Sequence, residues 1–211
     1  EVLYSSAKMS PEKYHSTNIP RRGVHIFVEG TPATAGYMAD VLFSGEHFPS
    51  DLDIMQRFGA KIIVYSSQLG AKFDKLYYPI FKIIFEKRFA AKYSRELLMR
   101  GVVYNVLLYE LGKQLHKFEG ARDRLKELYG PIDEANGFAS GIQHSKSLVI
   151  KGLISQDELE AIIITHILWM FADWVMYQYN KGKESHIIGN SMLLNSYLEN
   201  GALTVQRGIS W

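Results

Sequence analysis

The sequence contains no cysteine. This absence excludes disulfides, a cysteine nucleophile and every zinc or iron–sulfur site that depends on thiolate ligands. It leaves the compartment open, because oxidising and reducing environments both accept a chain without cysteine. A cytoplasmic location is the expectation for such a chain.

The chain also lacks an excess of either charge. Lysine and arginine total 24 and aspartate and glutamate total 22, which gives a formal net charge of +2. Proteins whose main ligand is a phosphate backbone or an anionic membrane surface usually show a clear basic excess. The balance therefore predicts that neither nucleic acid nor a membrane is a partner.

Long hydrophobic runs are missing as well. The most apolar stretch, Ile162 to Val175, contains His166 and Asp173 and is shorter than the roughly 20 residues that a membrane span requires. This stretch predicts a buried helix.

The 211 residues are 47% hydrophobic and 13% aromatic, enough for the core of a single domain over 1–211. Residues 1–47 form a loop-rich part with one predicted strand, 24–28; a turn of helix at 51–58 and a second strand at 60–66 follow. Apolar spacing, caps and breakers then predict helices over 72–88 with a kink at Pro79, 94–118, 131–150, 155–179 and 186–199. The predicted fold is mainly α with a small β element.

The most informative motif lies on the predicted helix 94–118. Tyr109-Glu110-Leu-Gly-Lys113 has the register of the H-E-x-x-H zinc helix, in which two histidines on one face bind the metal and the glutamate polarises a bound water. Here Tyr109 and Lys113 stand at the histidine positions, or Gln114 at the second if the spacing is one residue longer. All three are poor zinc ligands at neutral pH, so the motif predicts no bound metal.

Four blocks in order extend this comparison, namely FPSDLDIMQRFGAKIIVYSSQLGAKFDKLYYPI (48–80), LLYELGK (107–113), IDEANGFASG (132–141) and HIIGNSMLLN (186–195). Through them, residues 48–201 resemble the dipeptidyl peptidase III family of zinc metallopeptidases, particularly its shorter bacterial relatives. The resemblance implies the helical metal-binding region of that fold, with the two zinc-ligand histidines replaced. The family's full catalytic chains are much longer and form a two-lobed cleft, of which this chain lacks most of the first lobe.

The resemblance places the family's catalytic glutamate at Glu110, its third zinc ligand at Glu134 and its substrate-side histidine at His186, with Asn190 in the same segment. Without a metal, Glu134 and Asn190 are expected to bind substrate. Phe138 stands where the family has the last acidic residue of its downstream motif, a group that would orient a ligand histidine.

Lys113 offers a physical substitute for the metal. Its ammonium, facing Glu134 across the helix pair, would put positive charge about where the zinc ion was and compensate the buried Glu110 and Glu134. It would also lower the pKa of the Tyr109 phenol. Three interpretations stay open: an ion pair filling a dead site, a new metal-free acid–base site, or zinc held by Glu134 and other ligands. The Y-x-x-x-K pattern of short-chain dehydrogenases lacks its strand–G-x-G-x-x-G–helix context here.

The leading hypothesis is a metal-free and cofactor-free descendant that binds a small molecule or peptide in a cleft. If it is an enzyme, Tyr109, Glu110, Lys113 and His186 would move protons in an isomerisation, cyclisation or hydrolysis. One rival is a divergent zinc peptidase that uses Glu134 and ligands from elsewhere. Another, from a different class, is a catalytically silent interaction domain.

The remaining histidines differ in promise. His116 lies about 240° around its helix from Glu110, off the motif face. His144 lies only about 80° in helical phase from Glu134, which makes it the best candidate for a substitute ligand or a substrate-binding base. His166, among apolar residues, predicts a buried core histidine. The N-terminal part adds three histidines without a usable signal, His15, His25 and His47.

Overall fold

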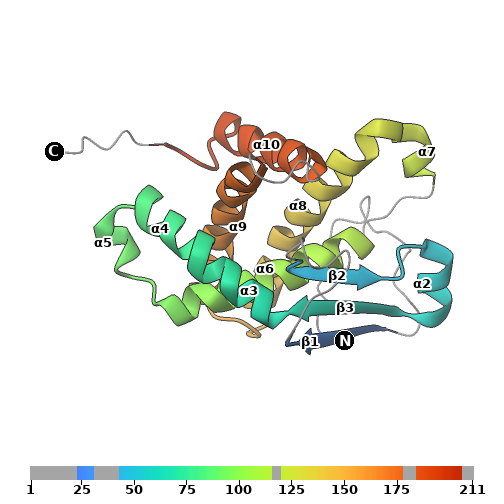
Figure 1. The fold of residues 1–211 in the computed structure, drawn as a ribbon, viewed down its shortest axis with the longest axis horizontal. Helices are drawn as coiled ribbons and strands as arrows, with labels where there is room; N and C mark the ends of the chain where they lie inside the picture. The colour runs from blue at the N-terminus through green and yellow to red at the C-terminus, as the bar shows by residue number, and fades with distance from the viewer. Residues whose placement is uncertain (1–22, 31–42, 116–119, 178–183, 206–211) are drawn as a thin grey trace.

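A computed structural model describes residues 23–30, 43–115, 120–177 and 184–205. A small sheet lies at one side of a larger group of helices (Figure 1). The strands and the first helices are β1 (Val24–Glu29), β2 (Gly45–Phe48), α2 (Leu52–Phe58), β3 (Ala60–Tyr65), α3 (Ser66–Lys72), the π-turn η3 (Phe73–Tyr77), α4 (Tyr78–Ile84) and α5 (Lys87–Ala90). The remaining elements are α6 (Arg95–Leu115), α7 (Ala121–Leu125), the 3-10 turn η4 (Lys126–Leu128), α8 (Tyr129–Ile150), α9 (Gln156–Tyr177) and α10 (Glu184–Glu199). The predicted fold class, mainly α with a small β element, is confirmed.

The sheet has three strands in the order β1–β3–β2. β1 runs parallel to β3 with Val24 opposite Ala60, and β2 runs antiparallel to β3 with His47 opposite Ile62. β1 and β3 are the two predicted strands. β2 was not predicted, because it has only four residues, begins at Gly45 and is followed by Pro49.

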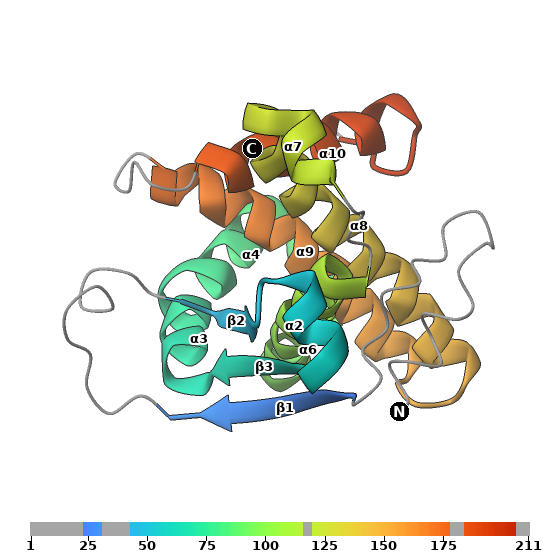
Figure 2. The same cartoon turned by 90° about the vertical axis from the view of Figure 1, so that its right-hand side faces the viewer.

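α6 is the central helix of the fold. It packs against α8 and α9 and also against β2 and β3, so it connects the helical part with the sheet (Figure 2). Local signals set the helix starts as predicted. The Ser94 hydroxyl accepts the Leu97 amide at 3.1 Å ahead of α6, and Ser155 and Glu158 form a reciprocal capping box ahead of α9.

The predicted helix over 72–88 differs in the structure. Helix already begins at Ser66, directly after β3, and the chain forms the π-turn η3 before Pro79. There the Tyr78 amide donates to the Phe73 carbonyl, five residues back. Pro79 lies in the first turn of α4, where its missing N–H leaves no bond unmade. The irregularity is therefore a π-turn in place of a kinked single helix.

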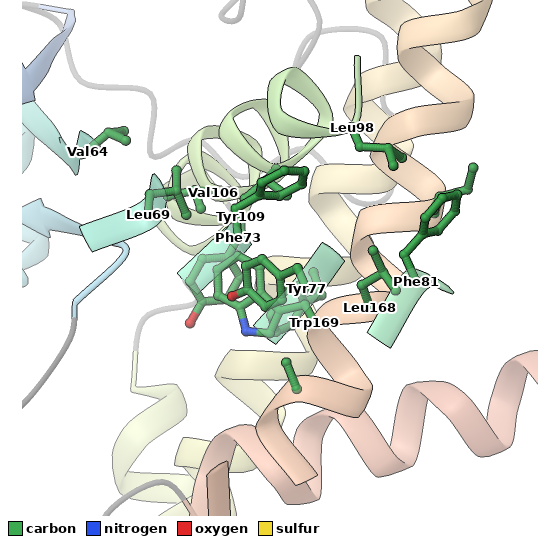
Figure 3. Close-up of a cluster of buried hydrophobic side chains, with 14 of the residues drawn as sticks. Val64, Leu69, Phe73, Tyr77, Phe81, Leu98, Val106, Tyr109, Leu168 and Trp169 are labelled. Atoms are coloured by element: carbon green, nitrogen blue, oxygen red, sulfur yellow. The ribbon is translucent and has the colours of Figure 1, made fainter. Parts of the chain in front are cut away.

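The main core joins the sheet, α3, α4, α6 and α9. Figure 3 shows its large side chains, among them Phe73, Phe81, Leu98 and Leu168, each 2% exposed or less. Tyr109 and Trp169 belong to the same cluster. The candidate site thus borders directly on the core.

α9 is the most apolar helix of the described residues. By length and composition alone it could cross a membrane, but 61% of its apolar window is buried inside the protein. Ile162 and Leu168 are fully buried in it, and Thr165 and His166 are buried beside them. α9 is therefore packed as a core helix, in agreement with the buried helix that the sequence predicts at 162–175.

Candidate functional site

Three helices and one strand meet at the carboxyl-terminal half of α6. α6 supplies Tyr109, Glu110 and Lys113, α8 supplies Glu134, and α10 supplies His186. The close approach of α10 depends on Gly189, because a Cβ there would lie 2.7 Å from the Pro131 carbonyl oxygen of α8. Because Gly189 has no side chain, α10 can lie close to α8, and His186 of α10 then lies beside Glu134 of α8.

Lys113 and Glu134 form the centre of a buried ionic network. The Lys113 Nζ lies 2.8 Å from Glu134 Oε1 and 3.3 Å from Asp133 Oδ2. On its other oxygen, Glu134 accepts the Tyr109 hydroxyl and lies 3.3 Å from His186 Nε2. The predicted pairing of Lys113 with Glu134 across the helix pair is present.

The network fixes the charges of its two central groups. Burial by itself would lower the pKa of Lys113, but the carboxylates of Glu134 and Asp133 raise it above its usual value. Burial would raise the pKa of Glu134, but His186 and Lys113 lower it. Lys113 is therefore an ammonium and Glu134 a carboxylate at neutral pH.

The predicted effect of Lys113 on Tyr109 is wrong. The pKa of the Tyr109 phenol is raised well above its usual value, because the ring is buried and the carboxylates of Glu134 and Glu110 lie close by. The Lys113 ammonium lies 3.3 Å from the hydroxyl, but these effects outweigh it. Tyr109 is thus a fixed hydrogen-bond donor to Glu134 and a poor general base.

His47 is the site residue that sequence reasoning missed. Its Nδ1 lies 2.6 Å from Glu110 Oε2, across a sequence separation of 63 residues. The two-residue period of β2 puts Gly45 and His47 on one face, but four residues are too few for this alternation to be recognised in the sequence. A Cβ at Gly45 would lie 2.6 Å from Val106 Cγ1 of α6, so that face packs closely against the helix that carries Glu110.

These side chains border a cavity of about 300 Å³. β2 and its flanks form one wall, α6 contributes Tyr109, Glu110 and Lys113, and single residues come from α3, α9 and α10. The complete lining is Phe43, Ser44, Gly45, Glu46, His47, Phe48, Ser50, Lys72, Tyr109, Glu110, Lys113, Trp169 and His186. All four residues predicted to move protons therefore line one cavity.

The other predicted residues lie elsewhere. Glu134 lies just behind the cavity, bonded to Tyr109 and Lys113, which line it. Asn190 is fully buried and donates to Asp173 Oδ2 at 2.8 Å. Neither residue is part of the cavity lining.

His144 is buried and also absent from the lining of the cavity, contrary to its prediction as a substrate-binding residue. Helical phase puts it near the face of Glu134, but the rise of an α-helix carries it about 15 Å along the axis over ten residues. His166 is buried as predicted, with its Nε2 3.3 Å from the Tyr197 hydroxyl. His116 lies outside the described residues.

The donors at the motif do not fit a zinc ion. Lys113 is held as an ammonium, which has no lone pair for a metal, and Tyr109 is held as a protonated phenol, which is a poor zinc ligand. In the parts of the chain that the structure describes, histidines and carboxylates form no group of three or more that could hold a metal ion.

Aromatic side chains of α8 and α9 pack around the ring of Tyr109. The Phe138 ring lies 4.5 Å from that of Tyr109 and 5.1 Å from that of Trp169, centroid to centroid. Phe138 is 1% exposed and forms part of the core. The position therefore adds apolar packing where a carboxylate would orient a ligand.

Two solved structures have a similar fold. The structure of DPP III from Caldithrix abyssi matches 97% of this chain with a TM-score of 0.77 and 22% sequence identity. The structure of dipeptidyl-peptidase III from Corallococcus sp. strain EGB matches 78% with a TM-score of 0.63 and 21% identity. The matches cover 40% and 31% of those longer chains. No protein-family model and no curated protein matches the sequence. This chain has a dipeptidyl peptidase III-like fold.

Proposed function

We propose that this chain forms a metal-independent ligand cleft within a dipeptidyl peptidase III-like fold. One observation carries the proposal: the Lys113 ammonium lies 2.8 Å from Glu134 and 3.3 Å from Asp133, beside Tyr109 at the first histidine position of the zinc motif. A lysine so placed supplies positive charge to Glu134, the carboxylate that the resemblance assigns to metal binding. The pocket keeps its shape and charge balance without a metal ion.

The size and lining of the cavity favour a small polar ligand. Its volume of about 300 Å³ lies at the lower end for small-molecule sites, in the range of an amino acid or a short peptide segment. Lys72, Lys113 and His186 offer cationic contacts, whereas Trp169 and Phe48 offer apolar ones. A small molecule or peptide end that bears a carboxylate satisfies both.

The chemistry that this lining supports is proton transfer. Lys113 keeps its protons, so its ammonium stabilises negative charge that develops on a ligand, whereas Tyr109 keeps its single proton in the hydrogen bond to Glu134. Glu110 and His186 line the same cavity and complete the predicted set. Isomerisation, cyclisation and hydrolysis of a small substrate all use such a set without a metal.

A zinc-binding experiment tests the proposal. Equilibrium dialysis against zinc chloride, followed by elemental analysis, should find no stoichiometric zinc on the unmodified chain. Tyr109→His combined with Lys113→His rebuilds two histidines beside Glu134, and this variant should gain about one zinc per chain. Tyr109→Phe combined with Lys113→Met removes the same two groups without adding ligands and serves as the matched control.

The outcomes separate the alternatives. About one zinc on the unmodified chain, lost in Glu134→Gln, would establish the divergent zinc peptidase and overturn the proposal. Absence of zinc on both the unmodified chain and the rebuilt variant would show that 109 and 113 do not face Glu134 as the zinc motif requires.

A further inference from the structure

We infer that His47, held by Glu110, is the proton-accepting group of the cleft, and that its substrates are small carbonyl compounds bearing a carboxylate. The inference rests on the proposed function and names the base that it requires. His47 and Glu110 both line the cavity, and their side chains are 10% and 9% exposed. The resemblance assigns neither a base nor any other role to His47.

The hydrogen bond sets the chemistry of the imidazole. Glu110 has only acceptor oxygens when ionised, so the His47 Nδ1 at 2.6 Å donates its proton to it. The lone pair is then on Nε2. When Nε2 takes a proton, the imidazolium that forms stays paired with the Glu110 carboxylate. Glu110 acts as a positioning residue in this pair, and His47 meets the ligand.

Contacts of two preceding residues hold the strand that carries His47 in place. Ser44 accepts the Lys72 ammonium at 2.8 Å, and Glu46 accepts the Tyr65 hydroxyl at 2.9 Å. The antiparallel pairing with β3 fixes the register of β2, because a slip of one residue would turn His47 away from α6. The imidazole is therefore positioned before any ligand enters, as an efficient base requires.

The other groups of the lining are poor candidates for the base. Lys113 is an ammonium with a raised pKa, and Tyr109 keeps its proton on an oxygen that donates to Glu134. His186 faces the Glu134 carboxylate through its Nε2 at 3.3 Å, so that nitrogen already has a partner. The two halves of the cleft thus differ. His47 of β2 and Glu110 form a basic pair in one half, and Lys113 near the end of α6 and His186 of α10 lie in the other half.

A base in one half of the cleft and an ammonium in the other indicate which class of substrate the cleft can convert. His47 removes a proton from a carbon next to a carbonyl, the electron pair of the C–H bond stays on the substrate, and the enolate is stabilised by Lys113. Return of the same proton from Nε2 to a neighbouring atom gives an isomer. The step consumes no water, oxidant or reductant. A carboxylate on the substrate would meet the Lys72 ammonium and the His186 imidazole, which also line the cavity.

Nitrogen-15 NMR of the imidazole rings tests the dyad on the unmodified chain, without dependence on the folding of a variant. At a pH at which the His47 ring is neutral, its proton should be on Nδ1. In Glu110→Leu this preference should be lost, whereas His25, an exposed residue of β1, should be unchanged. A neutral His47 ring with its proton on Nε2 instead of Nδ1 in the unmodified chain would overturn the inference.

Reactivity gives the second measurement, with p-nitrophenyl acetate as the probe. Nε2 attacks the acetyl carbon, the ester C–O bond breaks, p-nitrophenolate leaves, and water then hydrolyses the acetylimidazole to acetate. His47→Gln should lose most of the protein-dependent rate, Glu110→Leu should lower it severalfold, and His25→Gln should leave it unchanged. A folded His47→Gln with an unchanged rate would overturn the inference. Zinc on the unmodified chain would instead overturn the proposed function, whatever the reactivity of His47.

Discussion

The rings of Tyr109 and Phe138 lie 4.5 Å apart and pack against each other in the core. By the resemblance, Tyr109 stands at the place of a ligand histidine and Phe138 at the place of an acidic residue that would orient one. The two rings form one apolar contact, so a polar side chain at only one of the two positions would lie among aromatic rings.

Phe138→Asp tests this coupling. In the unmodified chain the new carboxylate would be buried beside Tyr109 without a partner, and it should lower the free energy of unfolding by about 3–5 kcal/mol. In the chain that carries Tyr109→His and Lys113→His it would orient an imidazole and should raise zinc affinity by about 10–100-fold. Urea unfolding and zinc titration measure the two effects. Phe138→Leu, which adds no charge, should leave zinc affinity unchanged, and an equal gain with Leu would contradict the coupling.

The Lys113–Glu134 pair should show strong coupling in a double-mutant cycle. Lys113→Met leaves the Glu134 carboxylate buried without its cation and should cost about 3–5 kcal/mol of unfolding free energy. Adding Glu134→Gln should restore much of that loss, because no unpaired charge remains at the position. Chemical denaturation measures the cycle, with Lys146→Met on the exposed face of α8 as the control. Strictly additive losses would show that the two groups do not interact.

Gly189→Ala should destabilise the protein by about 1–3 kcal/mol. The added Cβ would lie 2.7 Å from the Pro131 carbonyl and 3.0 Å from the Ala135 nitrogen, both backbone atoms, so α10 would have to move away from α8. Gly70→Ala in α3 is the matched control, since nothing lies within 4 Å of its Cβ position. That variant should be stabilised, by about 0.4–1 kcal/mol. Equal effects of the two substitutions in thermal unfolding would contradict the close helix crossing.

Stability should fall on mild acidification because of His166. Burial lowers the pKa of this imidazole to about 4, below its ordinary value of 6.5. Between these values the unfolded chain binds a proton that the folded chain does not, so stability decreases as the pH falls from 6.5 towards 4. The expected loss between pH 7 and pH 5 is about 2 kcal/mol. His166→Gln should remove this part of the pH dependence and His25→Gln should keep it, as urea unfolding at several pH values would show.

Local signals in the sequence were sufficient for most helices. The serine cap of α6 and the capping box of α9 lie within a few residues of the bonds they make, so spacing alone predicts them. The π-turn before Pro79 could not be predicted this way, because an i to i+5 turn has no fixed residue pattern. β2 was missed because four residues give too little alternation.

Some contacts of the candidate site also follow from local patterns in the sequence, and others do not. The Lys113–Glu134 contact follows from helical register once the two motif helices are paired, so the sequence predicts it. The His47–Glu110 contact joins a short strand to a helix 63 residues later, and no local pattern encodes such a meeting. Angular position alone places His144 near the face of Glu134, but the rise along the helix separates the two residues.

Trp169 lines the cavity and also packs against Tyr109, with ring centroids 5.6 Å apart. Because indole emission responds to nearby charge and water, the fluorescence of this side chain should report changes inside the cleft. The sequence has only two other tryptophans, Trp174 and Trp211, and replacing both with phenylalanine would leave Trp169 at the cavity wall as the single tryptophan. Occupancy of the cleft then becomes visible as a change in fluorescence, which allows compound libraries to be screened without a label and before any substrate is known.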